Sequence, residues 1–262
     1  MEPDVGQEVL TLRGRGPGHA VIGVLFSQPG LLRSRGRLGR LMGVAPLTEQ
    51  GMAWYRGALA EIAVGRMLSK LGPRWVVMHA VPVGRRGSDI DHLVVGSSGV
   101  FTVNTKNHSG QRVWVMDRHV VVAGHRCDHV RKSEFEASRV AKLLGEILGW
   151  PVPVRGVVAV LDPERLVVKQ RPPGVEVLEA RKLVRWLKKR KEFLDPGQVA
   201  QIGSIIGLRT TWQQGPETLL DLDRRAEFEQ LQRTVTHARR RRMAWAIGGL
   251  GVLVVGALLT LV

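Results

Sequence analysis

The side chains with the clearest chemical potential lie along one predicted β-hairpin. Gly96 and Gly99 flank a pair of serines, and this spacing predicts a two-residue loop that joins two β-rich runs. If the two glycines close that loop, Asp91 lies directly across from Asn104, with Cβ atoms about 5 Å apart. Lys106 lies two residues beyond Asn104, so both side chains point to one face of the sheet. The sequence therefore predicts a polar patch made of an aspartate, an asparagine and a lysine.

A patch of this composition suits metal-assisted cleavage of a phosphodiester. Asp91 would hold a divalent metal such as Mg²⁺, a second oxygen would complete the site, and Lys106 would orient water or stabilise the developing charge. Glu61 is predicted to join from the preceding helix, because glycines four residues away on either side leave room for a close approach. His92 should point away from Asp91 and pack. A simpler interpretation is a cross-strand cluster that only supports the hairpin.

Residues 84–110, GRRGSDIDHLVVGSSGVFTVNTKNHSG, resemble the nuclease-related domain (NERD) family, which is similar to the PD-(D/E)xK restriction-endonuclease-like fold. The resemblance extends from about Trp54 to Ile206. It implies a catalytic set of four residues: Glu61, Asp91, Asn104 and Lys106. Within this set it implies that Glu61 and Asp91 are the metal ligands. The position two before the lysine is usually acidic in active nucleases of the wider fold, and here it is Asn104, which adds no charge and should weaken metal binding.

This asparagine leaves more than one function open. One is a membrane-anchored, cytoplasm-facing nuclease-related protein that cleaves nucleic acid phosphodiesters with the help of a metal. The alternative is a catalytically silent module, also tethered to the membrane, that binds nucleic acid or a protein. A third interpretation is a surface that only faces lipid. Arg85 and Arg86 are predicted nucleic-acid contacts, and the basic helical faces 132–142 and 182–191 are either phosphate contacts or solvated surfaces.

The elements that must position these residues follow from hydrophobic periodicity. A helix is predicted from Met52 to Leu71, followed by short β-rich runs up to Val122. Further helices and strands are predicted at 133–148, 154–161, 175–178, 180–193 and 197–206. This order predicts an α/β fold in the broad sense, a mixed (α+β) sheet flanked by helices that is restriction-endonuclease-like, over residues 51–207.

The two ends of the chain carry different signals. Residues 1–50 are rich in Arg, Gly and Pro and are predicted to form a mobile basic arm. Residues 208–243 are predicted as a linker and a charged juxtamembrane helix. Residues 244–262 contain no charge and, as a helix of about 28 Å, are predicted to cross a membrane. The arginines at 239–242 would keep the soluble domain in the cytoplasm of a single-pass cell-membrane protein and would contact anionic lipid.

Composition narrows the class of protein. The chain has 262 residues and a formal net charge of +16, a balance that attracts polyanions such as nucleic acid or anionic headgroups. Cys127 is the single cysteine, so the sequence offers neither an intrachain disulfide nor a cysteine-rich zinc module. A reducing, cytoplasmic setting is expected.

Overall fold

The structure is a computed structural model that describes residues 11–83, 89–212 and 223–259, with side chains of the last helix given as far as Gly248. The chain forms two compact units. The first contains the described parts of 1–20 and 56–218, and the second those of 21–55 and 219–262. Helix α4 (Glu49–Leu68) contributes to both units.

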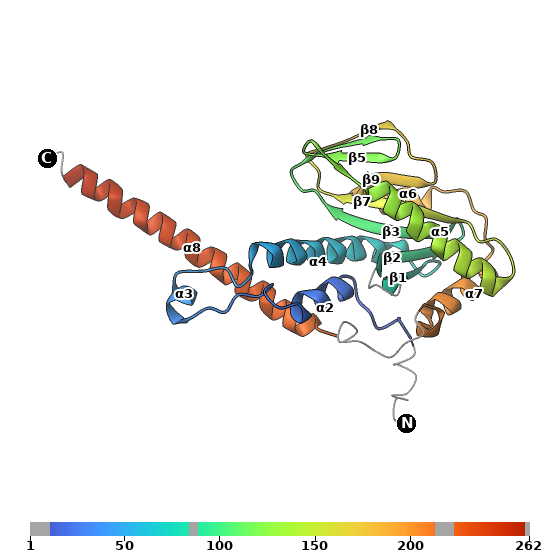
Figure 1. Ribbon diagram of the computed structural model, residues 1–262, viewed down its shortest axis with the longest axis horizontal. Coiled ribbons are helices and arrows are strands. Elements are labelled where there is room, and N and C mark those ends of the chain that lie inside the picture. The colour runs from blue at the N-terminus through green and yellow to red at the C-terminus, as the bar shows by residue number, and fades with distance from the viewer. Residues whose placement is uncertain (1–10, 84–88, 213–222, 260–262) are drawn as a thin grey trace, which may run out of the picture. The chain divides into compact units, whose positions relative to one another are not determined.

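The described residues of the first unit form two β-sheets. The larger has the order β1-β2-β3-β7-β9 and the smaller has the order β6-β5-β4-β8. The strands of the larger sheet are β1 (Val76–Pro82), β2 (Asp89–Gly96), β3 (Gly99–Asn107), β7 (Val154–Leu161) and β9 (Val175–Glu179). Those of the smaller sheet are β4 (Arg112–Met116), β5 (His119–Val122), β6 (His125–Cys127) and β8 (Arg165–Gln170). Figure 1 shows the smaller sheet, through its labels β5 and β8, next to β7 and β9.

Pairing in the larger sheet changes direction at β3. The strands β1, β2 and β3 are antiparallel neighbours, whereas β7 lies parallel to β3 and β9 lies parallel to β7. The β7 sequence, VRGVVAVL, is almost continuously apolar, as expected for a parallel strand that is covered on both faces. The predicted mixed α/β fold with flanking helices is therefore confirmed, with two sheets in place of one.

Helices cover both faces of the larger sheet. Helices α5 (His129–Leu148) and α7 (Pro196–Gly207) pack with side chains of β1, β2 and β3 in one core cluster. Helices α4 and α6 (Leu183–Lys188) pack in a second cluster against alternate residues of β2, β3 and β7. Short 3-10 turns lie at Ser69–Leu71, Ala180–Lys182 and Arg209–Thr211. The polar ends of β2 and β3 thus lie between two apolar layers.

The second unit contains helices α2 (His19–Ser27, mostly in this unit), α3 (Arg37–Leu41) and α8 (Arg225–Leu259). Within the stretch predicted to be an arm, Leu25 and Leu31 are fully buried. A Cβ at Gly43 would lie 2.5 Å from the carbonyl oxygen of Ala238, so the α3 segment packs against α8 too closely for a larger residue. Residues 25–43 therefore take part in the packing of the second unit.

The terminal helix corrects one prediction. Helix α8 is 35 residues long, but its first half carries many charged side chains, including Arg239–Arg242. In the part of the chain that the structure describes, no helix combines the length and apolarity that crossing a membrane requires, so the predicted transmembrane helix at 244–262 is not supported. The predicted lipid contact at the arginines gains no support either, since Arg241 donates a hydrogen bond to the carbonyl oxygen of Arg40. The cytoplasmic location stays a prediction.

Candidate functional site

The β2–β3 hairpin has the predicted register. Gly96 pairs with Gly99 and His92 pairs with Val103, which are the partners that a two-residue loop requires. Beyond His92 the side chain of Asp91 intervenes, and its Oδ2 accepts the backbone N–H of Thr105 at 2.6 Å. In an uninterrupted antiparallel ladder this N–H would bond to a carbonyl of β2. The paired register thus ends one residue before Asp91 and Asn104, and the carboxylate of Asp91 takes the place of a backbone bond of the sheet.

Asn104 is buried and bonds to a residue that the sequence did not single out. Its Nδ2 donates to both carboxylate oxygens of Glu136, at 3.2 and 3.3 Å. The Oδ1 of Asn104 is buried and has no hydrogen-bond partner among the described residues. When Glu136 is ionised, its carboxylate only accepts hydrogen bonds, so the Nδ2 of Asn104 must face it. A buried amide oxygen without a donor is uncommon in proteins and calls for an explanation.

Close packing of α5 brings Glu136 to this position. A Cβ at Gly156 of β7 would lie 2.5 Å from Ser133 Oγ, so α5 approaches the strand where only glycine fits. Ser133 is fully buried, and Glu136 lies one turn further along the same helix. Burial is the main cause that raises the pKa of Glu136 to about 7; the Asn104 hydrogen bond opposes this effect, and the charge of Asp91 adds to it.

Glu61 approaches from α4 and is buried. A Cβ at Gly65 would lie 2.5 Å from Pro17, so the predicted room on this face of α4 is occupied by the chain around Pro17. The next residue, Gly18, donates its backbone N–H to Glu61. Burial raises the pKa of Glu61 well above its usual value, Asp91 raises it further, and the charge of Lys106 lowers it. Glu61 is therefore close enough to Asp91 and Lys106 for their charges to shift its pKa.

Lys106 is the cation shared by this group. Its charge lowers the pKa of Glu61, Asp91 and Glu136, each of which burial raises. For Asp91 the hydrogen bond from Thr105 also lowers the pKa, although the net shift is upward. The structure thus gathers Glu61, Asp91, Asn104, Lys106 and Glu136, and these five residues are called the carboxylate cluster below.

A pair of histidines lies on the other side of Thr105. His79 Nδ1 and His92 Nδ1 are 2.8 Å apart, and His92 Nε2 lies 3.2 Å from Thr105 Oγ1. His92 is fully buried, which confirms that it packs, and burial lowers the pKa of His79 to about 4 and that of His92 well below its usual value. The two residues, called the histidine pair below, are therefore neutral at physiological pH, with one ring donating to the other.

A second histidine contact flanks Lys106. His108 Nε2 and His129 Nε2 are 3.0 Å apart, with the rings stacked. Burial, with Lys106 as the next cause, lowers the pKa of His129 to about 3. His108 also has a lowered pKa, mainly through burial. Both rings stay neutral beside the lysine, so they add no positive charge near it.

Two of the predicted site residues fall outside the part of the chain that the structure describes, and one residue of the site was not predicted. Arg85 and Arg86, the predicted nucleic-acid contacts, lie outside the described residues. Glu136 was missed because the helix that carries it was interpreted only as a basic face. Its position in the helix could have revealed it. Glu136 lies on the stripe of α5 that contains the buried residues Ser133, Ala137 and Val140, where a carboxylate needs a polar partner.

The carboxylate cluster has donors suited to a hard divalent cation. Among residues 11–83, 89–212 and 223–259, no three His, Cys, Asp or Glu side chains are arranged to hold a metal. An asparagine oxygen is a further ligand for Mg²⁺ or Ca²⁺, and the buried Oδ1 of Asn104 has no hydrogen-bond partner among these residues. The donor set Asp91, Asn104 and Glu61 therefore fits such an ion in chemical type.

The comparisons with known proteins agree with the resemblance in the sequence. Residues 56–161 match the model of the nuclease-related domain, NERD. This range includes Glu61, Asp91, Asn104, Lys106 and Glu136. The mixed sheet with its flanking helices is compatible with the PD-(D/E)xK-like fold.

Similarity to individual proteins is more limited. An uncharacterized protein of Bacillus anthracis is 45% identical over 60 residues, which are 21% of this chain and 28% of that protein. The chain thus matches little more than a quarter of the length of this relative. The structure of Pyrococcus furiosus SfsA in complex with Ca²⁺ is 17% identical and covers 48% of this chain and 55% of its own, with a TM-score of 0.24. The family match at 56–161 is what identifies this part of the chain as similar to nuclease-related domains.

Proposed function

We propose that the first unit is a metal-dependent nuclease that cleaves phosphodiester bonds of nucleic acid. The observation that carries the proposal is the buried Oδ1 of Asn104, which has no hydrogen-bond partner among the described residues and lies in a cluster that contains Asp91 and Lys106. The match of residues 56–161 to the nuclease-related domain supports the same reaction class. Carboxyl groups with raised pKa values next to a lysine are typical of functional sites.

The residues that would hold the cation are Asp91, Asn104 and Glu61. Such a cation, when bound, would act as a Lewis acid toward the phosphodiester and lower the pKa of a bound water. Asp91 and Glu61 both have raised pKa values, so each must release its proton before it can serve as a ligand. The asparagine contributes an oxygen without charge, and the site therefore depends on these two carboxylates for its negative charge.

The remaining members of the cluster act on the substrate. Lys106 carries the positive charge that would face the phosphate oxygens and stabilise charge that develops on them. Glu136, with a pKa of about 7, is ionised in about half of the molecules at neutral pH and can accept a proton from an attacking water. Its hydrogen bond from Asn104 holds the carboxylate in place.

The test is a cleavage assay with the full chain. Labelled DNA and RNA are incubated with Mg²⁺ or Mn²⁺, and the expected result is cleavage that needs the metal and disappears in Asp91→Ala and in Lys106→Ala. Arg118→Ala is the matched control, because Arg118 is exposed in the turn between β4 and β5 and its loss removes the same charge.

The opposite outcome identifies the alternative function. If the wild-type chain binds nucleic acid in a salt-sensitive manner but leaves it intact with both metals, the nuclease proposal is wrong. The first unit is then a silent binding module, in which Asn104 and Glu136 stabilise the fold and Lys106 contacts phosphate.

A further inference from the structure

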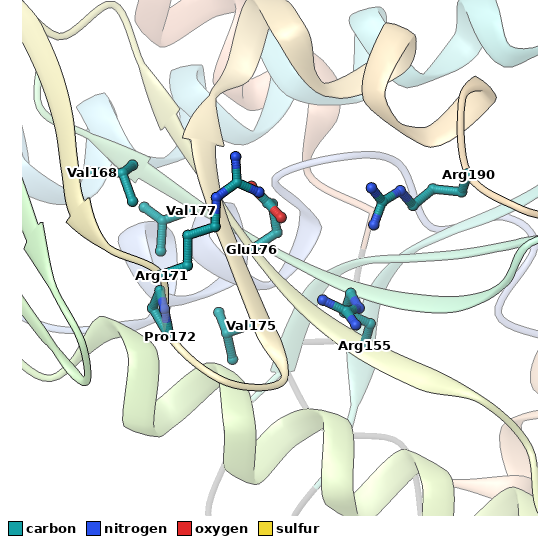
Figure 2. A pocket seen from close by; sticks show the side chains of 8 residues that line it. All are labelled: Arg155, Val168, Arg171, Pro172, Val175, Glu176, Val177 and Arg190. Carbon is teal, nitrogen blue, oxygen red and sulfur yellow. The ribbon is translucent and has the colours of Figure 1, made fainter.

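A small cavity lies at the edge of the larger sheet, away from the carboxylate cluster. It has a volume of about 120 Å³ and is lined by residues of β7, β8, β9 and the segment that follows α6. Three of the lining residues are arginines: Arg155 in β7, Arg171 just after β8, and Arg190 just after α6. Figure 2 shows their guanidinium groups around the same space, together with Glu176.

The cavity carries an excess of positive charge. Glu176 is the one acidic residue that lines it, and its Oε1 lies 3.9 Å from Arg171 Nη1, at the limit of an ion pair. The guanidinium of Arg190 lies 4.6 Å from the centre of the Trp186 ring, a contact that orients it without neutralising it. One carboxylate thus faces three guanidinium groups, and a bound anion would neutralise the remaining positive charge.

The size of the cavity limits the anion. The cavity has a volume of about 120 Å³. Cavities that hold a drug-sized molecule or a whole cofactor are larger, at about 300 to 1,000 Å³. A single tetrahedral oxyanion fits this volume, and guanidinium groups bind phosphate oxygens in pairs with a geometry that a lysine lacks.

The cavity is separate from the carboxylate cluster. Arg155 lies opposite Phe101 at the start of β7, and Val158, three residues further on, lies opposite Asn104. Three residues along a strand span about 10 Å, and an odd number of residues places the two side chains on opposite faces of the sheet. Arg155 therefore lies on the face of the sheet opposite Asn104, and none of the residues that line the cavity belongs to the carboxylate cluster.

We propose that this cavity binds one phosphate group through Arg155, Arg171 and Arg190. The phosphate is either that of a small phosphorylated molecule or a backbone phosphate of a nucleic acid strand. The site does not depend on cleavage, so it goes beyond the proposed nuclease function. Apolar side chains of Val168, Pro172, Val175 and Val177 complete the wall.

The first experiment measures phosphate binding. Inorganic phosphate is titrated into the full chain by calorimetry at constant ionic strength, with the wild type and the variants Arg155→Gln, Arg171→Gln and Arg118→Gln. We expect at least tenfold weaker binding in the first two and no change in the third. Arg155 and Arg171 are both exposed, and a second variant is available if one of them fails to fold. Equal affinity in all four proteins would overturn the proposal.

The second experiment identifies the source of the phosphate. A short labelled oligonucleotide is titrated at several salt concentrations into the same proteins. If the site contacts a nucleic acid backbone, Arg155→Gln should weaken oligonucleotide binding and reduce the salt slope by about one. If only inorganic phosphate binding changes, the ligand is a small phosphorylated molecule. Asp91→Asn, which keeps an acceptor for the Thr105 N–H, should keep phosphate binding in either case, so failure of the nuclease proposal is distinguishable from failure of this one.

Discussion

The carboxylate cluster and the histidine pair are two polar groups, each made of buried and half-buried side chains, that meet at one residue. They differ in how completely their hydrogen-bonding atoms are satisfied. Thr105 donates its backbone N–H to Asp91 on one side, and its hydroxyl contacts His92 on the other. Burial shifts the pKa values in opposite directions, upward for the carboxyls and downward for the histidines, because it favours the neutral form of each.

The difference lies in what remains open. The histidine pair forms a chain of hydrogen bonds that ends at Thr105, so its neutral rings have partners. In the carboxylate cluster, the Oδ1 of Asn104 is buried and has no hydrogen-bond partner among the described residues. The same cluster contains the positive charge of Lys106. Buried polar groups normally stabilise a fold only when they are satisfied. The histidine pair is therefore suited to stabilising the fold, whereas the carboxylate cluster is suited to binding a ligand.

The largest effect should come from Asp91→Asn. The amide oxygen can still accept the Thr105 N–H, so the hairpin should keep its stability within about 1 kcal/mol. The loss of one ligand charge should reduce metal-dependent cleavage about a thousandfold, which corresponds to several kcal/mol of transition-state stabilisation. Cleavage rates and urea unfolding of the same protein give both values. Full activity in this variant would remove Asp91 from the chemistry.

The pH dependence should separate Glu136 from the rest of the cluster. Because its pKa is about 7, its carboxylate is available above that pH, and the raised pKa values of Asp91 and Glu61 act in the same direction. The cleavage rate should therefore rise as the pH increases through 7. In Glu136→Gln this rise should be smaller, and the rate lower, at every pH. A profile identical to that of the wild type would contradict the role of Glu136 as a base.

Acid should destabilise the histidine pair. The pKa of His79 is about 4 in the folded chain and about 6.5 when unfolded, so its stabilisation is complete above pH 6.5 and is lost as the pH falls toward 4. At pH 5 the loss is about 2 kcal/mol for this residue. Glu136 acts in the opposite direction, because its raised pKa favours the folded state as the pH falls below 7.

Urea unfolding at pH 7 and pH 5 measures this balance. Glu136→Gln should lose more stability on acidification than the wild type, because the opposing carboxyl is gone. His92→Gln, which removes the inner ring, should lose less. If both variants change in the same direction, the opposing shifts assigned to the two groups are wrong.

The smallest effect should come from Thr105→Val. This substitution removes the hydroxyl that contacts His92 and leaves the backbone N–H that bonds to Asp91. Stability should fall by about 1 kcal/mol, the usual net value of one buried hydrogen bond. Cleavage should stay within about threefold of the wild type, since that factor is well under 1 kcal/mol. A loss of activity as large as that in Asp91→Asn would show that the two groups act as one.

The hairpin could be predicted from sequence because its information is local. Gly96 and Gly99 fix the loop, and the loop fixes which residues of β2 and β3 face each other. Asp91, Asn104 and Lys106 followed from that register. The hydrogen bond from Thr105 to Asp91 did not, because a side chain that replaces a ladder bond leaves no trace in the hydrophobic pattern.

The parts that were missed depend on contacts between distant segments. Glu136 reaches Asn104 because α5 packs closely on Gly156, a contact that joins elements of different sequence regions. Strand β8 has an exposed, charged edge sequence with weak alternation, so the second sheet was not foreseen. The terminal helix was assigned to a membrane from its apolar end alone, although α8 continues from a charged segment without interruption.

The double use of Asp91 affects how such a chain would diverge. Its carboxylate holds the N–H of Thr105 whether or not any substrate is ever cut. A descendant that lost cleavage would still be under selection to keep an acceptor at position 91, whereas Lys106 and Glu136 could drift. An aspartate that descendants retain at position 91 would therefore be weak evidence that they cleave nucleic acid. Retention of Lys106 and Glu136 would be stronger evidence.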